Sequence, residues 1–221
     1  MQHEPLARAA QKRTREHILN VAEKLFAEHG LDRVSIRDIA REAQVNLGAV
    51  NYHFQSRERL VIEIFSRCLS PLNRARLEAL AALEQASGPR GPSVKKILGA
   101  FIRPAVELAL QDATREQARN LLMGRVVAES DPALQEWMRK EMEPLLQRYD
   151  KALHRALPRL GHEDIFWGMS FTFGALNHLL MSAAKPVPIW KRVNTPLTAQ
   201  IERLINFAVA GICASAPPRK T

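Results

Sequence analysis

Three hydrogen-bonding side chains stand next to one another at Asn51, Tyr52 and His53, within the segment VNLGAVNYHFQSRERL, residues 45–60. An amide, a phenol and an imidazole can together donate and accept hydrogen bonds, which suits the recognition of a polar surface. The helical segment that carries them is rich in small residues and too short to be stable alone. A larger structure must therefore hold these side chains in place.

The chain shows no residue pattern for catalysis or metal binding. Its seven histidines form no HExxH motif and no Glu-x-x-His pair of a bundle di-metal site, and it has no nucleophile elbow. Cys68 and Cys213 lie in apolar helical patterns without CxxC spacing, so we expect reduced core residues rather than a disulfide or a zinc site. We therefore predict no enzyme activity, no metal and no cofactor, and keep a helical-bundle enzyme as an alternative.

Apolar periodicity predicts the helices that would position the polar side chains. An apolar stripe over residues 14–28 stops at Gly30, where a left-handed residue commonly ends a helix. Ser35, Asn46 and Ser56 each precede a new helical pattern and are residues that cap helix N-termini. The sequence therefore predicts one longer helix followed by short helices with defined starts.

Two helices of about two turns, joined by three or four residues and supported by a longer helix, match a helix-turn-helix unit. The second helix of such a unit lies in the DNA major groove. It needs small residues near the sugar-phosphate walls, apolar residues toward its supporting helices and polar side chains facing outward. Gly48 and Ala49 meet the first need, and Val50 and Phe54 meet the second. The segment that begins at Asn46 is therefore predicted to be a recognition helix.

Residues 18–61 resemble the DNA-binding domain of the TetR family of bacterial transcriptional regulators. The motif AEKLFAEHG, the SIRDIAREA helix and the YHF-x-S-[KR] ending all occur in the family's order. The resemblance implies double-stranded DNA as a partner, in the form of a palindromic operator. It also implies DNA contacts from Ser35, Arg37, Asn46, Leu47, Gly48, Tyr52, His53 and Arg57.

Three positions depart from the residues that are usual in the family. Gln44 stands where the family usually has glycine, so the turn must accept a side chain, with strain if its φ is positive. Leu47 replaces a polar or basic residue, and Asn51 replaces a tyrosine. A leucine can contact a thymine methyl group and an asparagine can pair with adenine, so we hypothesise that Leu47 and Asn51 set the operator preference. The alternative for each polar side chain is a phosphate contact or a purely structural role.

The chain beyond residue 56 reads as helical throughout, so the expected fold class is all-α. We expect a basic arm and a three-helix helix-turn-helix domain at residues 1–56, and a larger helical effector-binding and dimerisation domain at residues 57–221. The expected helices of the second domain lie at residues 57–86, 93–111, 114–129, 133–157, 163–184 and 197–214.

The expected helix at residues 163–184 is apolar nearly all round, so it must be buried on more than one side. With the final helix of each subunit it would form a four-helix dimer interface, as the family resemblance implies. A homodimer also suits an operator with two half-sites, because two recognition helices enter successive grooves. The alternative is a buried helix pair in a monomer.

A small, largely apolar effector is expected to bind between helices of the second domain. The stretches FSRCLSPLNRARLEAL and IFWGMSFTFGALNHLLMS resemble a subgroup of fatty-acid or acyl-CoA responsive regulators. Arg125, a cation within an apolar stretch, either pairs with Glu129 or holds the carboxylate or phosphate of an acyl ligand. The predicted effector contacts are Phe101, Arg125, Met142, Trp167, Phe171 and His178, and the alternative for the uncharged ones is core packing.

The net charge of +9 is a weak argument for nucleic-acid binding, because residues 1–60 carry ten lysines and arginines against eight aspartates and glutamates. The basic cluster of residues 8–15 has no acid, and we expect it to be unfolded in the free protein and to contact phosphate or the minor groove. No long apolar run or secretion signal is evident, so we expect a cytoplasmic protein with no membrane partner.

These features predict a ligand-responsive dimeric transcriptional regulator, most simply a repressor that the effector releases from its operator. A basic helical protein that coats nucleic acid without specificity is the other alternative. It would need a continuous cationic face, which the mixed charges do not provide.

Overall fold

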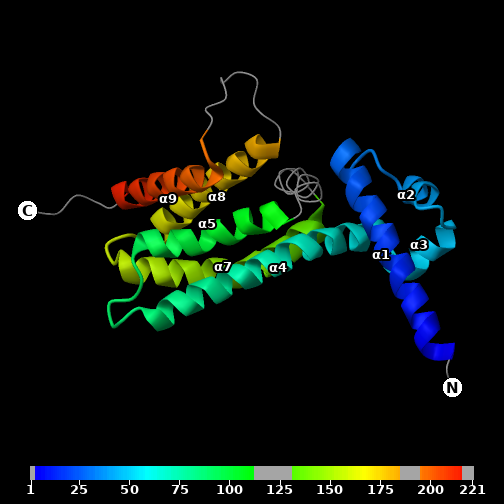
Figure 1. Ribbon diagram of the computed structural model, residues 1–221, viewed down its shortest axis with the longest axis horizontal. Helices are drawn as coiled ribbons and strands as arrows, with labels where there is room; N and C mark the ends of the chain where they lie inside the picture. The colour runs from blue at the N-terminus through cyan, green and yellow to red at the C-terminus, as the bar shows by residue number, and fades with distance from the viewer. Residues whose placement is uncertain (1–2, 112–130, 185–194, 216–221) are drawn as a thin grey trace, which may run out of the picture. The chain divides into compact units, whose positions relative to one another are not determined.

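The computed structural model describes residues 3–111, 131–184 and 195–215 of the 221-residue chain. Within these ranges every regular element is a helix and no strand occurs, which confirms the all-α prediction. The helix expected at residues 114–129 lies outside the described residues. The described helices, drawn in Figure 1, are α1 (His3–His29), α2 (Ile36–Glu42), α3 (Leu47–Phe54), α4 (Arg57–Ala86), α5 (Val94–Gln111), α7 (Pro132–Ala156), α8 (His162–Ala184) and α9 (Leu197–Ala214).

By packing, the described chain divides into two compact units. The first contains residues up to Leu69 and residues 131–138, and the remaining described residues form the second. Helices α4 and α7 therefore contribute residues to both units. The domain boundary expected between residues 56 and 57 stays a prediction, since α4 begins there and its N-terminal part belongs to the first unit.

Side-chain caps set where the short helices of the first unit begin. On α2 the Asp38 N–H donates to Ser35 Oγ (3.2 Å), and the Ser35 N–H donates to Asp38 Oδ2 (3.1 Å), which makes a reciprocal capping box. On α3 the Ala49 N–H donates to Asn46 Oδ1 at 2.7 Å. Ser56 Oγ accepts a backbone N–H at the start of α4. All three predicted caps are confirmed.

One hydrophobic cluster holds α1, α2, α3 and the start of α4 together. Its buried members include Phe26 of α1, Ile39 of α2, Phe54 of α3 and Phe65 of α4. The eight-residue α3 contributes only two buried side chains, Val50 and Phe54. Because isolated helices of that length are not stable in water, this packing maintains α3.

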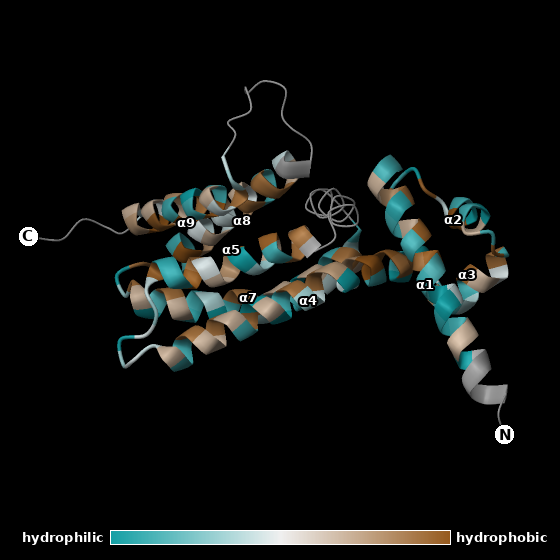
Figure 2. Cartoon of the chain, in the orientation of Figure 1, coloured by the Kyte–Doolittle hydropathy of each residue, from teal (hydrophilic) through white to brown (hydrophobic). Residues whose placement is uncertain are grey.

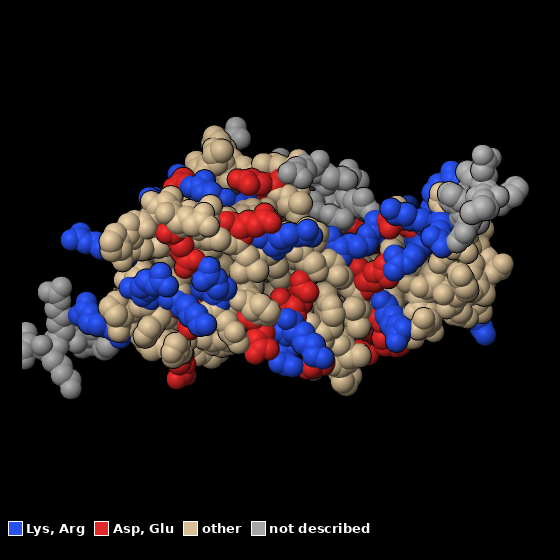
Figure 3. Space-filling model, turned by 90° about the horizontal axis from the view of Figure 1, so that it is seen from below, with Lys and Arg blue, Asp and Glu red and all other residues tan. Residues whose placement is uncertain are grey.

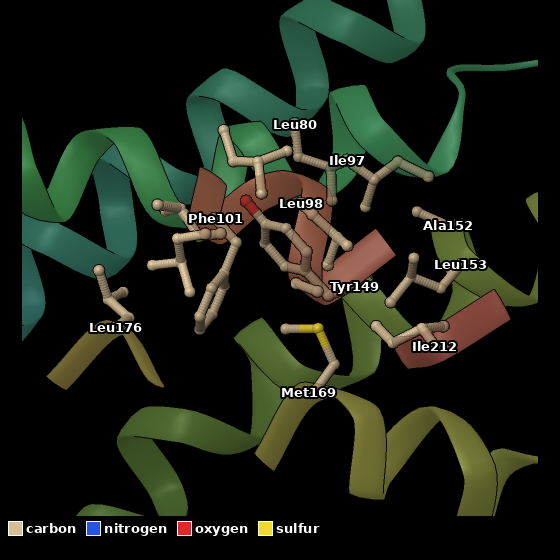
Figure 4. Packing of buried hydrophobic residues seen from close by; sticks show 14 of the residues in the cluster. Leu80, Ile97, Leu98, Phe101, Tyr149, Ala152, Leu153, Met169, Leu176 and Ile212 are labelled. Carbon is tan, nitrogen blue, oxygen red and sulfur yellow. The ribbon is translucent and has the colours of Figure 1, made fainter. Parts of the chain in front are cut away.

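A second hydrophobic cluster fills the interior of the second unit, between α4, α5, α7, α8 and α9 (Figure 4). Apolar residues recur along each of these helices, as the brown bands in Figure 2 show. Within the cluster the rings of Phe101 and Tyr149 meet edge to face, with centroids 5.3 Å apart. Helices α8 and α9 approach closely at Gly168, where any side chain would collide with Ile212.

Helix α1 begins at His3, so the basic cluster of residues 8–15 is helical. The expectation that this cluster is unfolded in the free protein is therefore wrong. Arg15 forms an ion pair with Glu63 of α4, and its guanidinium carbon lies 5.4 Å from the centroid of the Phe54 ring. These contacts hold the C-terminal end of the basic cluster in place. The rest of the cluster lies toward the N-terminus of α1.

Two non-glycine residues in the described part of the chain have positive φ angles, and both follow a short helix. Gln44, in the turn between α2 and α3, has φ 53°, which confirms the strain predicted for a side chain at this position. Gln55, which caps the C-terminus of α3, has φ 64°, and no sequence pattern predicts it. A left-handed backbone costs a residue with a side chain roughly 1–2 kcal/mol. Positive φ angles thus occur just before α3, at Gln44, and just after it, at Gln55.

Candidate functional site

The outward side of α3 is a stripe of exposed residues. The stripe consists of Leu47, Gly48, Asn51, Tyr52 and the cap residue Gln55. Their spacing places them on one side of a helix, with the buried Val50 and Phe54 on the other. Tyr52 is 69% exposed, although it is a large aromatic residue. The structure therefore presents the predicted recognition helix with its apolar side packed and its polar side free.

The first turn of α3 combines a side-chain cap with a glycine. A Cβ atom at Gly48 would lie 3.3 Å from Asn46 Oδ1, closer than most carbon contacts. Glycine therefore leaves room for the Asn46 side chain that caps the helix. The same missing side chain would allow a sugar-phosphate backbone to come close.

The first turn of α2 carries Ser35 and Arg37, which are both exposed. The hydroxyl and N–H of Ser35, and then the guanidinium of Arg41, hold the pKa of Asp38 below its usual value. Arg41 is thereby paired with Asp38 at 2.6 Å. Arg37 makes no hydrogen bond or ion pair with the described residues, so its charge is available to an external anion.

His53 and Arg57 are half-buried rather than exposed. The His53 ring meets the Tyr52 ring edge to face, with centroids 5.2 Å apart. Arg57 donates from Nη2 to the carbonyl oxygen of Leu31 and from Nε to that of Val34, the latter at 3.4 Å. Arg57 therefore ties the start of α4 to the loop between α1 and α2. Its predicted phosphate contact would have to coexist with this structural role.

Two exposed residues of this surface, Gln55 and Arg59, are not among the predicted contacts. Arg59 donates to Gln55 Oε1 across the junction of α3 and α4, and both side chains are exposed. The sequence signal for Arg59 is a basic residue two positions beyond the serine cap of α4, in the first turn after the recognition helix.

Charged side chains of both signs lie on the surface of the second unit, and several form ion pairs. Figure 3 shows lysine and arginine interspersed with aspartate and glutamate over one face of the chain. Arg148 lies 2.5 Å from Glu84, and Glu202 pairs with both Lys95 and Arg103. The hydrogen bonds from Arg103 and Lys95 hold the pKa of Glu202 below its usual value. This pairing disfavours a protein that coats nucleic acid through a continuous basic surface.

Two of the predicted effector contacts lie in the interior of the second unit. Phe101 is 1% exposed, and Met142 packs against the same cluster. The Sδ atom of Met142 lies 3.6 Å from Nδ2 of Asn73 on α4. Arg125 lies outside the described residues. The effector-binding roles of all three residues stay predictions.

The other three predicted effector contacts, Trp167, Phe171 and His178, are exposed on α8. Trp167 is 50% and Phe171 is 67% exposed, and their rings stack with centroids 5.8 Å apart. His178 shares a hydrogen bond of 3.3 Å with the Ser182 hydroxyl. Within one subunit these residues do not share the interior that holds Phe101, and their effector contacts stay predictions.

Helix α9, which lies beside α8 (Figure 1), also exposes apolar residues. Phe207 is 67% exposed. Cys213 is exposed too, so the expectation of a core cysteine is wrong there, whereas Cys68 is buried as expected. A Cβ atom added at Gly174 or Gly211 would touch nothing. We call the exposed residues Trp167, Phe171, Gly174, Phe207, Ala210 and Gly211 the α8–α9 face.

Among the described helices, α9 alone is long and apolar enough to span a membrane by length and composition. Only 22% of its residues are buried within the subunit. Its Glu202 nevertheless pairs with Lys95 and Arg103 of α5, which fixes one side of α9 against its own subunit. The apolar character of α9 therefore exceeds what the core of one subunit requires.

Two family models match the chain. Residues 18–64 match the model described as bacterial regulatory proteins, tetR family, and residues 99–211 match the model described as tetracyclin repressor-like, C-terminal domain. The first match contains α2, α3 and the start of α4. The second contains α7, α8 and most of α5 and α9, and by itself covers half of the sequence.

Curated relatives and solved structures agree with these matches. The HTH-type transcriptional regulator AcrR of Shigella flexneri is 33% identical over 110 residues, which are 50% of this chain and 46% of AcrR. The HTH-type transcriptional regulator BetI of Agrobacterium fabrum is 37% identical over 87 residues, 39% of this chain and 37% of BetI. The matched segment thus spans less than half the length of either relative. Both relatives are named as regulators and neither as an enzyme.

A solved structure of the transcriptional regulator FadR from Bacillus subtilis, in complex with stearoyl-CoA, superimposes with a TM-score of 0.65. It covers 89% of this chain and 98% of its own, at 16% sequence identity. At that identity the likeness shows the shared fold.

The role of Arg57 can be tested by replacing it with methionine. Arg57→Met removes the donors to the Leu31 and Val34 carbonyls, so we expect urea denaturation to show a loss of about 1–3 kcal/mol in the free energy of unfolding. The matched control, Arg59→Met at an exposed site, should change it by less than about 0.5 kcal/mol. An Arg57→Met protein as stable as the parent would mean that this guanidinium is free for phosphate.

Proposed function

The chain belongs to the TetR family of bacterial regulatory proteins, and on that premise we propose that it is a dimeric, ligand-responsive transcriptional repressor. It binds a palindromic operator through α3 of each subunit and leaves the operator when a small, largely apolar effector binds. The observation that carries this proposal is the two-sided character of α3. The helix packs through Val50 and Phe54 and leaves Asn51 and Tyr52 exposed.

Some of the exposed side chains position the protein on the duplex, and others recognise bases. Ser35 and Arg37, at the start of α2, contact phosphates and fix the register of the protein on the duplex. Asn51 reads adenine and Leu47, which is 39% exposed, contacts a thymine methyl group in the major groove. The helical basic cluster of residues 8–15 adds contacts to the DNA backbone or the minor groove. An operator as partner places the protein in the cytoplasm.

The α8–α9 face is the proposed dimer interface. Exposed Trp167, Phe171 and Phe207 would be covered in a homodimer, and the open space at Gly174 and Gly211 would admit the helices of a second subunit. A dimer brings two copies of α3 to half-sites roughly 34–36 Å apart, one turn of the duplex. This arrangement explains why a soluble helix pair retains so much exposed apolar area.

The effector acts by linkage between the two units. A ligand that binds more tightly to a conformation in which the α3 helices do not fit the operator lowers the affinity of the protein for DNA. The largest factor by which it can do so is the ratio of the ligand's affinities for the two conformations. The solved FadR of Bacillus subtilis holds stearoyl-CoA, which supports a fatty acid or acyl-CoA as the effector of this protein. Phe101, which is buried, and Met142, which is half-buried, provide apolar surroundings of the kind that such a ligand requires.

The base-reading role of Asn51 is tested by selecting bound sites from random duplexes. The parent protein should select a site with two-fold symmetry, and Asn51→Ala should lose the preference at one base pair in each half-site, worth about 1–3 kcal/mol. Gln147→Ala, on the exposed side of α7, is the matched control and should select the parental site. An Asn51→Ala protein with unchanged preference at every position would remove Asn51 from this role.

The dimer interface is tested by placing a charge on the α8–α9 face. Phe207→Glu should sediment as a monomer and bind the selected operator far more weakly, because the two half-sites are no longer linked through one dimer. Leu146→Glu introduces the same charge at an exposed apolar residue of α7 and should remain a dimer. If Phe207→Glu and Phe171→Glu both remain dimers, the interface lies elsewhere.

A further inference from the structure

Arg76 is the largest fully buried side chain in the described part of the chain, with 1% exposure. It lies on α4 in a buried stripe with Leu69, Asn73 and Leu80. Of these three neighbours only Asn73 is polar. Charged side chains are almost never fully buried unless they are paired. A buried arginine in the interior of the second unit therefore requires an explanation.

Among the described residues, no side chain provides a counterion for the charge of Arg76. Its Nε donates to the Phe101 carbonyl oxygen at 2.9 Å, and its guanidinium carbon lies 4.0 Å from the centroid of the Phe101 ring. The Tyr149 hydroxyl donates to the backbone oxygen of Arg76 at 3.0 Å and not to the guanidinium. No carboxylate among the described residues forms an ion pair with Arg76, and its Nη1 has no hydrogen-bond partner.

Asn73, one turn before Arg76, is also incompletely paired. Its side chain is 4% exposed, and Nδ2 donates to the Glu141 carbonyl oxygen at 3.4 Å and to Met142 Sδ at 3.6 Å. Its Oδ1 atom is buried and has no partner. Residues three apart on a helix are neighbours, so α4 presents two unpaired polar groups on one face.

An unpaired buried cation is unfavourable, and folding alone does not account for it. Burial lowers the pKa of Arg76 to about 10, so the guanidinium is still protonated at neutral pH. Replacement of buried ionic groups by apolar residues of similar size is often neutral or stabilising. Buried charges kept at such a cost are frequently binding groups.

We propose that Arg76, with Asn73 beside it, anchors the carboxylate of a small organic acid with an apolar body. This inference rests on the proposed function, because that acid would be its effector. The carboxylate would supply the missing counterion through charge-assisted hydrogen bonds from the guanidinium. Phe101 and Met142, two residues predicted from the sequence to contact the effector, are the residues that contact Arg76 and Asn73.

The position of the anchor on α4 suits a regulatory ligand. Arg76 belongs to the second unit, and the same helix carries Arg57 and Arg67 of the first. Arg67 binds Glu16 at 3.0 Å and Asn20 at 3.1 Å on α1. A ligand that displaces α4 at Arg76 therefore acts on a helix that is hydrogen-bonded, through Arg67, to α1.

The test compares two carboxylates with matched neutral molecules, octanoate with octanol and phenylacetate with phenylethanol, by calorimetric titration of the full-length protein. At least one carboxylate should bind the parent protein roughly tenfold more tightly than its alcohol, and Arg76→Met should abolish that preference. Arg103→Met, which removes an exposed arginine of α5, should preserve it. Equal affinity for acid and alcohol, no binding of either acid, or a preference that survives in Arg76→Met would each overturn the proposal.

The unliganded variants separate an anchor from a structural residue. The melting temperature of Arg76→Met without ligand should equal or exceed that of the parent, because methionine replaces an unpaired charge. Arg76→Lys retains the charge and should retain a preference for the carboxylate, with reduced affinity. An Arg76→Met protein that melts at a lower temperature, together with an Arg76→Lys protein that has no preference for the acid, would assign Arg76 a structural role.

Failure of this inference and failure of the proposed function give different results. Carboxylate binding is measured without DNA, and operator selection is measured without a ligand. A protein that selects an operator but shows no acid preference retains its function and loses the anchor. A protein with the Arg76-dependent preference but no selected operator retains the anchor and loses the regulatory function.

Discussion

The packing of Val50 and Phe54 in one hydrophobic cluster with α1 and α2 is the interaction on which the DNA-binding unit depends. An eight-residue helix cannot persist in water by its own hydrogen bonds, so these two side chains keep α3 folded. Asn51 and Tyr52, on the outward side of α3, take no part in this packing. The Asn46 cap and the two residues with positive φ, Gln44 and Gln55, define the two ends of the helix.

The second unit departs from ordinary burial in two ways. Arg76, a charged residue, is inside, whereas Trp167, Phe171 and Phe207 are outside. Each departure costs free energy in an isolated subunit, and each would be relieved by binding: the charge by an anion and the aromatic face by a second subunit. The two proposed activities, effector binding and dimerisation, would thus depend on distinct physical features of one helical bundle. The two features lie on different helices, α4 for the charge and α8 with α9 for the aromatic face.

Local interactions account for what the sequence predicts well. Capping by Ser35, Asn46 and Ser56 involves neighbours within three residues, so residue type and spacing reveal it. The bounds of α9 agree with the expected residues 197–214 for the same reason, because proline precedes its apolar repeat.

Features that the sequence does not predict depend on interactions between residues that are far apart in the chain. Arg57 looks like a surface cation at a helix start, and only the folded loop brings the Leu31 and Val34 carbonyls to it. Periodicity shows that the helix at residues 163–184 is apolar but not whether its own core or another chain covers each side, so Trp167 and Phe171 could be assigned to a pocket. Arg76 lies in the charge-rich stretch NRARLEAL, where burial of one of two arginines depends on which face meets α5.

The polar side of α3 is exposed in the free protein and, in the proposed function, is covered by operator DNA. Hydroxyl-radical footprinting with mass spectrometry measures this directly, because the two tyrosines of the chain differ in exposure: Tyr52 is 69% exposed and Tyr149 is buried. Tyr52 should be oxidised readily in the free protein and protected by a selected operator duplex but not by an unrelated duplex, while Tyr149 stays unreactive throughout. Unchanged oxidation of Tyr52 in a protein saturated with its selected operator would mean that α3 is not the surface that binds DNA.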